Sequence, residues 1–98
     1  MFKDLDPILH SQVRLAIMTI LLPLKSAEFS YLMDNIQTTK GNLSFQITKL
    51  KDAGYVEVIK SFKNNYPLTT LKITQKGIDA YDLYIESITE YFTKSGKQ

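Results

Sequence analysis

The sequence predicts a mainly helical α+β fold, and three changes of pattern along its 98 residues support that prediction. Leu43, Ile47 and Leu50 recur at the i, i+4 and i+7 spacing of one helix face. Residues 55–73 then favour two strands, because β-branched and aromatic side chains flank a polar turn. Helical spacing returns in residues 74–92, so a hairpin separates the helical part from a long last helix.

Length and composition suit one domain over residues 1–98. The chain has no cysteine, which excludes a disulfide framework and a thiolate metal site and agrees with the cytoplasmic location that we expect. Residues 1–10 carry acids without a long apolar run, so no signal peptide is expected. The longest apolar stretch, residues 15–24, is too short to span a bilayer, and no membrane partner is expected.

The net charge of +2 hides an uneven distribution. Residues 37–76 contain seven lysines and two carboxylates, a net charge of +5, whereas the remainder of the chain is at −3. Such a basic block is expected of a surface that meets phosphate, although an ordinary lysine-rich surface would have the same composition.

The first helix is predicted to begin at Asp6 and Pro7, a cap residue followed by the proline that the first helical position favours, and to end at Pro23. A connector at residues 24–27 can supply a short edge strand. A second helix is expected over residues 28–36, since its apolar side chains gather on one side.

The third helix is predicted over residues 39–53. Thr38 or Thr39 can cap its start, and Gly54 suits the left-handed residue that ends a helix. Opposite its apolar stripe lie small polar residues, Lys49 and Phe45, and an outward phenylalanine is unusual on a solvated helix. Two short helices joined by a tight polar turn are the helix-turn-helix pattern.

A hairpin follows, with strands expected over residues 55–62 and 68–73. Residues 63–67 are expected to form its turn, because asparagine tolerates positive φ and Pro67 is excluded from a central strand position. Thr74 can cap the last helix, which we expect to end near residue 92.

The complete order of helix, short strand, two helices, hairpin and helix is that of a winged helix-turn-helix domain. Three segments, HSQVRLAIMTILL, TTKGNLSFQITKLKDAGYVEVIKSF and PLTTLKITQKGIDAY, resemble small single-domain winged-helix transcriptional regulators of the MarR/ArsR-like superfamily. The resemblance implies a sequence-specific regulator that binds double-stranded DNA as a homodimer. It places the third helix in the major groove and the wing, residues 60–70, on the adjacent backbone or minor groove.

The candidate DNA contacts are polar, cationic or aromatic residues of the third helix and the hairpin. They are Thr38, Thr39, Lys40, Gly41, Asn42, Ser44, Phe45, Thr48, Lys49, Lys60, Lys63, Asn64, Asn65 and Tyr66. Lysines suit phosphates, Asn42 an adenine edge, and Phe45 a thymine methyl group. The alternatives are a solvated helix surface for Asn42 and Ser44, and packing against a neighbouring subunit or loop for Phe45. Related proteins often carry arginine at the wing tip, so backbone contact by Lys63 is the better-supported expectation here.

Residues 74–92 are expected to form a dimerisation helix, because their tyrosine and isoleucine side is wider than a small domain needs. The start of the chain offers further apolar side chains nearby. The predicted interface consists of Phe2, Leu5, Ile8, Leu9, Tyr81, Tyr84, Ile85, Ile88, Tyr91 and Phe92. The alternative is that both segments only cover the core of one subunit.

No catalytic set, metal cluster or nucleotide fingerprint occurs in the sequence, so neither an enzyme nor a cofactor is expected. Arg14 and Gln46 can contact DNA or serve the structure, and we favour the structural role. A protein-interaction module remains an alternative to DNA binding. A small-molecule effector between the first and last helices is possible, but the sequence identifies none.

Overall fold

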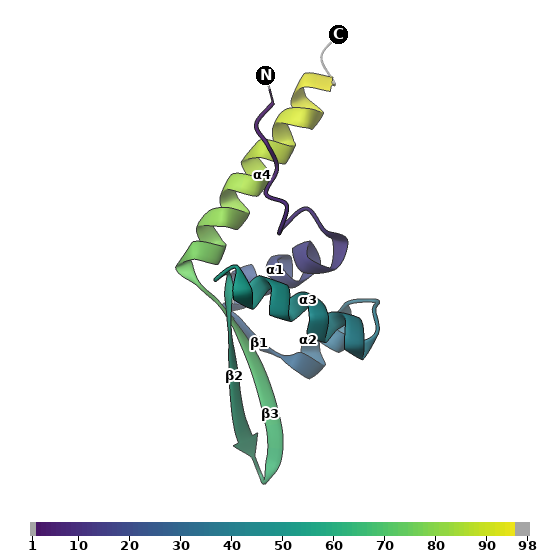
Figure 1. Cartoon of the computed structure of the whole chain (residues 1–98), viewed down its shortest axis with the longest axis vertical. Helices are drawn as coiled ribbons and strands as arrows, with labels where there is room; N and C mark the ends of the chain where they lie inside the picture. Colours follow the sequence, from purple (N-terminus) through teal and green to yellow (C-terminus); the bar gives the residue numbers. More distant parts are fainter. Residues whose placement is uncertain (1, 96–98) are drawn as a thin grey trace.

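The computed structural model describes residues 2–95; residue 1 and residues 96–98 lie outside that part. Seven elements follow one another, namely α1 (Gln12–Leu24), β1 (Ser26–Glu28), α2 (Phe29–Asn35), α3 (Lys40–Asp52), β2 (Val56–Lys63), β3 (Tyr66–Ile73) and α4 (Gln75–Ser95). The predicted winged helix-turn-helix order is confirmed. The molecule is 59 Å long, with the hairpin projecting at one end and α4 at the other (Figure 1).

The first helix starts later than the sequence suggested. α1 begins at Gln12, whereas Asp6 and Pro7 open a separate turn. The Asp6 carboxylate accepts the Ile8 amide at 2.8 Å, and its carbonyl accepts the amides of Leu9 and His10. An aspartate side chain can satisfy nearby amides without a helix, and that local alternative prevails here. The turn carries Leu9 into the core, while residues 2–6 run beside α4 (Figure 1).

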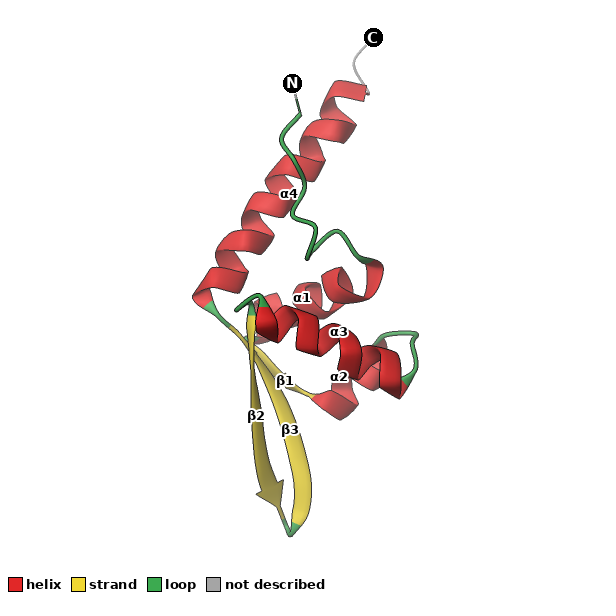
Figure 2. Ribbon diagram, in the orientation of Figure 1, coloured by secondary structure: helices red, strands yellow, loops and turns green. Residues whose placement is uncertain are grey.

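The three strands form an antiparallel sheet in the order β1-β3-β2. The two-residue turn at Asn64 and Asn65, with φ of 51° and 67°, joins β2 to β3, as a type I′ hairpin requires. Pro67 therefore lies within β3, opposite Phe62, and not in the turn as predicted. It is tolerated because β1 pairs only with residues 70–72, so the edge of β3 is open at Pro67. The hairpin projects beyond the helices (Figure 2).

The core lies where the helices meet the base of the sheet. Its fully buried large side chains are Leu9, Ile17, Met18, Leu21, Leu32, Leu43, Leu50 and Leu71. The predicted stripe of α3 is buried in this core, which leaves the opposite side of the helix in solvent. Within the described residues, no helix combines the length and apolar character needed to cross a membrane.

One junction fixes α4 against the end of α3. Gly54, at φ 82°, ends the turn after α3, and its carbonyl accepts the Thr74 hydroxyl at 2.7 Å. The same hydroxyl oxygen accepts the Gly77 amide at 3.0 Å, which caps α4 as predicted. A Cβ on Gly77 would lie 2.3 Å from the Tyr55 carbonyl oxygen, so only glycine allows this approach. The direction of α4 is thus tied to that of α3.

Candidate nucleic-acid interface

The outward side of α3 combines cations, small polar groups and one aromatic ring. Thr39 caps the helix by accepting the Asn42 amide at 3.1 Å. Phe45 is 56% exposed, and the Lys49 ammonium lies 5.0 Å from its ring centroid. A cation above an aromatic face is held there by the ring quadrupole, so the two side chains form one exposed unit. The surface is therefore apolar at Phe45, with the positive charge of Lys49 directly beside it.

A hydrogen-bonded chain crosses from α1 to this surface. Arg14 donates to the Gln46 side-chain oxygen, Gln46 donates to the Asn42 oxygen at 3.1 Å, and Asn42 donates to the Thr38 hydroxyl at 2.8 Å. Arg14 also donates to the Ile8 carbonyl at 2.6 Å. These bonds are consistent with the structural role that we favoured for Arg14 and Gln46, and they hold Asn42 in one orientation.

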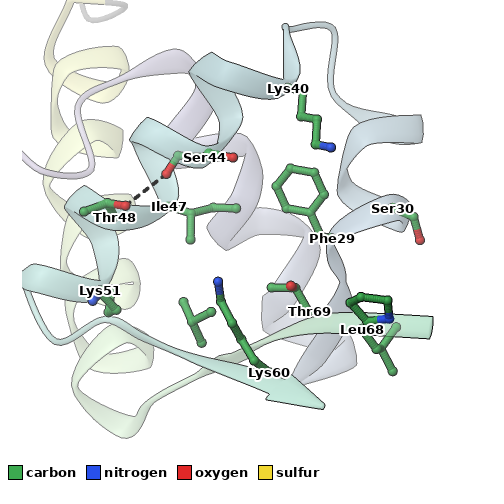
Figure 3. A pocket seen from close by; sticks show the side chains of 12 residues that line it. Phe29, Ser30, Lys40, Ser44, Ile47, Thr48, Lys51, Lys60, Leu68 and Thr69 are labelled. Carbon is green, nitrogen blue, oxygen red and sulfur yellow. Dashed lines mark hydrogen bonds between the residues drawn. The ribbon is translucent and has the colours of Figure 1, made fainter. Parts of the chain in front are cut away.

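An open groove of about 680 Å³ separates α3 from the hairpin (Figure 3). Lys40 and Lys51 of α3 line one wall and Lys60 of β2 lines the other, and Phe29 and Ser30 of α2 also line the groove. Figure 3 shows Lys40 and Lys60 extending into the space between the walls. No carboxylate is among the residues that line this groove. Three ammonium groups around one furrow suit the phosphates of a nucleic-acid strand.

Three polar groove residues, Lys51, Ser30 and Thr69, were not predicted as DNA contacts. Lys51 lies beside the apolar stripe in the helical projection, and only the position of the hairpin shows that it faces a groove. Ser30, at the start of α2, has no sequence signal that separates it from an ordinary surface serine. Conversely, the Thr48 hydroxyl donates to the Ser44 carbonyl at 3.1 Å, so its hydrogen is already used within the helix.

The wing is more apolar than its predicted polar tip suggests. Lys63, Asn64 and Asn65 are exposed as predicted, but Phe62 and Tyr66 are each 75% exposed. Phe62 was not predicted as a contact. Because alternate strand residues share a face, Phe62 lies on the same side of the hairpin as Lys60, a groove residue. The groove face thus continues toward the tip through Phe62, whereas Tyr66, which pairs with Lys63, lies on the opposite face of the hairpin.

The predicted dimer residues fall into three groups. Leu9 and Tyr84 are 0% and 5% exposed, so they belong to the core of one subunit and offer no surface to a partner, which corrects that part of the prediction. The half-buried residues that pack against this core are Leu5, Ile8, Tyr81 and Ile88. The third group lies farther from the core: Phe2 stacks on Tyr91 at 4.4 Å, while Ile85 and Phe92 are exposed.

Tyr55 connects the N-terminal turn to the junction after α3. Its hydroxyl donates to the Asp6 carboxylate. Burial, followed by this hydrogen bond and the carboxylate charge, raises the pKa of Tyr55 to about 12. Tyr55 is therefore neutral at physiological pH and remains a hydrogen-bond donor. Among the described residues, no three potential metal ligands come together.

A helix-turn-helix unit, a hairpin wing and a basic groove between them define the winged-helix class of DNA-binding domains. The family model for the winged helix DNA-binding domain matches residues 13–92, and the chain belongs to that family. It is thus a small winged-helix DNA-binding regulator.

Relatives and solved structures agree with this assignment. An uncharacterized protein of Methanocaldococcus jannaschii is 39% identical over 83 residues, which are 85% of this chain and 90% of that protein. The structure of a transcriptional regulator homologue from Pyrococcus horikoshii superposes with a TM-score of 0.85 at 31% identity, over 92% of this chain and 89% of that one. A MepR-like protein solved with pseudoligands shares the fold, at a TM-score of 0.71 and 17% identity, over 90% and 63% of the two chains.

Proposed function

We propose that the protein is a sequence-specific regulator that binds double-stranded DNA as a homodimer, with α3 in the major groove. The observation that carries the proposal is the lysine-lined groove between α3 and the hairpin. A helix in the major groove leaves one phosphate strand beside it, and this groove is the adjacent basic surface. The protein would act in the cytoplasm. It would repress or activate transcription by binding at a promoter.

Phosphate contacts are assigned to the lysines. Lys40, Lys51 and Lys60 would meet one strand within the groove, and Lys49 and Lys63 would meet the backbone on either side of it. The hydroxyls of Thr38 and Thr39 accept bonds from Asn42, and each still has a hydrogen for a phosphate oxygen. These contacts fix position on the duplex but carry no sequence information.

Base contacts are assigned to the outward side of α3. Asn42 suits the hydrogen-bonding edge of adenine, Ser44 can pair with either kind of group, and Phe45 fits a thymine methyl group. The wing would contact the DNA backbone or the edge of the minor groove. Phe62 and Tyr66 would then pack against the sugars, and Lys63 would contact a phosphate. Gly41 leaves open space at the start of α3, because a Cβ added there would meet no described atom within 4 Å, so a duplex can approach the helix backbone closely.

Dimerisation is assigned to α4 and the N-terminal segment. α4 extends past the core (Figure 1). Ile85 and Phe92 are exposed, and their spacing of seven residues places them on one flank of the helix. One winged helix meets few phosphates, and two copies related by a two-fold axis would place two α3 helices about one DNA turn apart. The Thr74 and Gly77 junction would set this spacing, because it fixes α4 against α3.

The experiment is a selection from randomised DNA followed by sequencing, with affinity then measured between about 50 and 300 mM salt. We expect a palindromic sequence to be enriched and affinity to fall steeply with salt, since released counterions dominate phosphate binding. No enriched sequence, or affinity that is independent of salt, would refute the proposal. A direct repeat or a single half-site would refute the two-fold dimer alone.

One observation favours a second candidate, a protein-interaction module. Phe45, Phe62 and Tyr66 are all more than half exposed, and aromatic side chains are favoured anchors of protein interfaces. Such a module would not need the lysines of the groove. Replacing Lys40 and Lys60 by alanine separates the two, because it strongly weakens DNA binding in the first case and leaves partner binding intact in the second.

A further inference from the structure

One guanidinium fixes the direction of two side-chain amides in series. Arg14 donates Nε to the Ile8 carbonyl at 2.6 Å, Nη2 to the Pro7 carbonyl at 3.4 Å, and Nη1 to Gln46. Because a guanidinium has only donors, the oxygen of Gln46 must face it. The nitrogen of Gln46 then faces the other way, toward Asn42 one helical turn earlier.

The same logic orients Asn42. Its Oδ1 accepts from Gln46 at 3.1 Å, and its Nδ2 donates to the Thr38 hydroxyl at 2.8 Å. If the Asn42 amide were rotated by about 180°, its NH₂ group would face the NH₂ group of Gln46, and no hydrogen bond could form between them. Each end of the amide keeps one group for DNA, an N–H on Nδ2 and a lone pair on Oδ1, and Asn42 is exposed.

We propose that Arg14 and Gln46 are positioning residues that set the base preference of Asn42. This inference rests on the proposed DNA-binding function. With its amide fixed, Asn42 can pair its N–H with N7 and its oxygen with the N6 amino group of adenine in only one orientation of the base. An amide that rotates freely could pair with adenine in either orientation. Arg14 is 32 residues from Gln46 in the chain and touches no DNA in this scheme, so its effect acts entirely through Gln46.

The decisive variant is Gln46→Glu. A carboxylate still accepts from Arg14, but its second oxygen now faces Asn42 and can only accept. Asn42 must then turn its nitrogen toward residue 46, and its oxygen can accept from the Thr38 hydroxyl, which is able to donate. The groups that Asn42 presents to DNA are thereby exchanged in place.

The readout is selection from randomised DNA, with the position read by Asn42 identified as the one at which Asn42→Ala loses preference. We expect Gln46→Glu to change the preferred base pair at that position and to leave the other positions as they are. Gln46→Met, which removes the bond to Asn42 without reversing it, should keep the preferred base and reduce discrimination about three- to tenfold. An unchanged preference and discrimination in both variants would overturn the inference.

Two controls separate this inference from other causes. In an Asn42→Ala background, Gln46→Glu should no longer alter the preferred base, and a change that persists would show direct contact by residue 46 and overturn the inference. Arg14→Lys keeps a donor-only group and should retain the wild-type preference better than Arg14→Met. A wild-type protein that enriches no sequence would remove the proposed function and this inference together, whereas normal selection with unaffected variants would remove the inference only.

Discussion

Two exposed regions of the molecule differ in what surrounds their apolar side chains. One is α3 together with the hairpin, and the other is α4. Phe45 and Phe62 lie among lysines, and the groove beside them is lined without a carboxylate. The apolar residues of α4 lie among Asp79, Asp82, Glu86 and Glu90. DNA is negatively charged, so we expect it to attract the first surface and to repel the second, which would orient the domain on a duplex with α4 pointing away. A modest net charge thus conceals two surfaces that differ in charge.

The largest effect is expected when two groove lysines are removed together. Lys40→Ala with Lys60→Ala should weaken binding to every DNA sequence roughly 30- to 300-fold at moderate salt and lower the slope of log affinity against log salt by about 2. Fluorescence anisotropy with labelled duplexes measures both quantities. The matched control is Lys3→Ala with Lys94→Ala, which removes the same charge from the opposite end. If the control weakens binding equally, net charge and not the groove determines affinity.

The next effect concerns the α4 surface. Ile85→Asp places a charge on the flank that also exposes Phe92, and we expect it to convert the dimer to monomer at micromolar concentration and weaken operator binding by about tenfold or more. Leu83→Asp is the comparison, because Leu83 is 54% exposed but lies about 160° around the helix from Ile85. Light scattering after size-exclusion chromatography measures the mass. A wild-type monomer, or dissociation by Leu83→Asp alone, would place the interface elsewhere.

Gly77 in α4 and Gly41 in α3 allow the two regions to be compared by the free energy of unfolding. Gly77→Ala sets a methyl group 2.3 Å from the Tyr55 carbonyl and should lower the free energy of unfolding by about 2–3 kcal/mol. Gly41→Ala meets nothing within 4 Å and should raise it by up to about 1 kcal/mol, since alanine is the better helix former. Urea denaturation followed by circular dichroism measures both. Equal effects would show that close packing at Gly77 does not lock α4.

The smallest effect distinguishes the two helix caps. Thr39→Ala removes one cap bond from α3 and should cost about 1 kcal/mol of unfolding free energy. Thr74→Ala removes the equivalent bond from α4 and also the bond to the Gly54 carbonyl, so it should cost about 2 kcal/mol. Valine in place of each threonine preserves the shape and tests the hydroxyl alone. A larger loss at Thr39 would mean that the junction adds no stability.

Local signals were reliable where one residue and its neighbours decide the backbone. The Thr39 cap, the left-handed Gly54, the Thr74 cap and the positive φ at the two asparagines all follow from side-chain chemistry within four residues. The same signals failed at Asp6, because a carboxylate that can cap a helix can also hold a turn and accept the Tyr55 hydroxyl 49 residues away. Local sequence signals cannot show whether a carboxylate will bond to a nearby amide or to a hydroxyl far away in the chain.

The order of elements, the buried stripe of α3 and the basic character of the region around it could all be predicted from the sequence, because helical period, turn residues and charge depend on neighbouring residues. The folded arrangement was needed to show that Lys51 joins Lys40 and Lys60 around one groove, that Leu9 and Tyr84 fill the core, and that Arg14 reaches Gln46. Those contacts depend on how α1 and the hairpin pack against α3. Packing is set by all the buried side chains together, so no short stretch of sequence contains it.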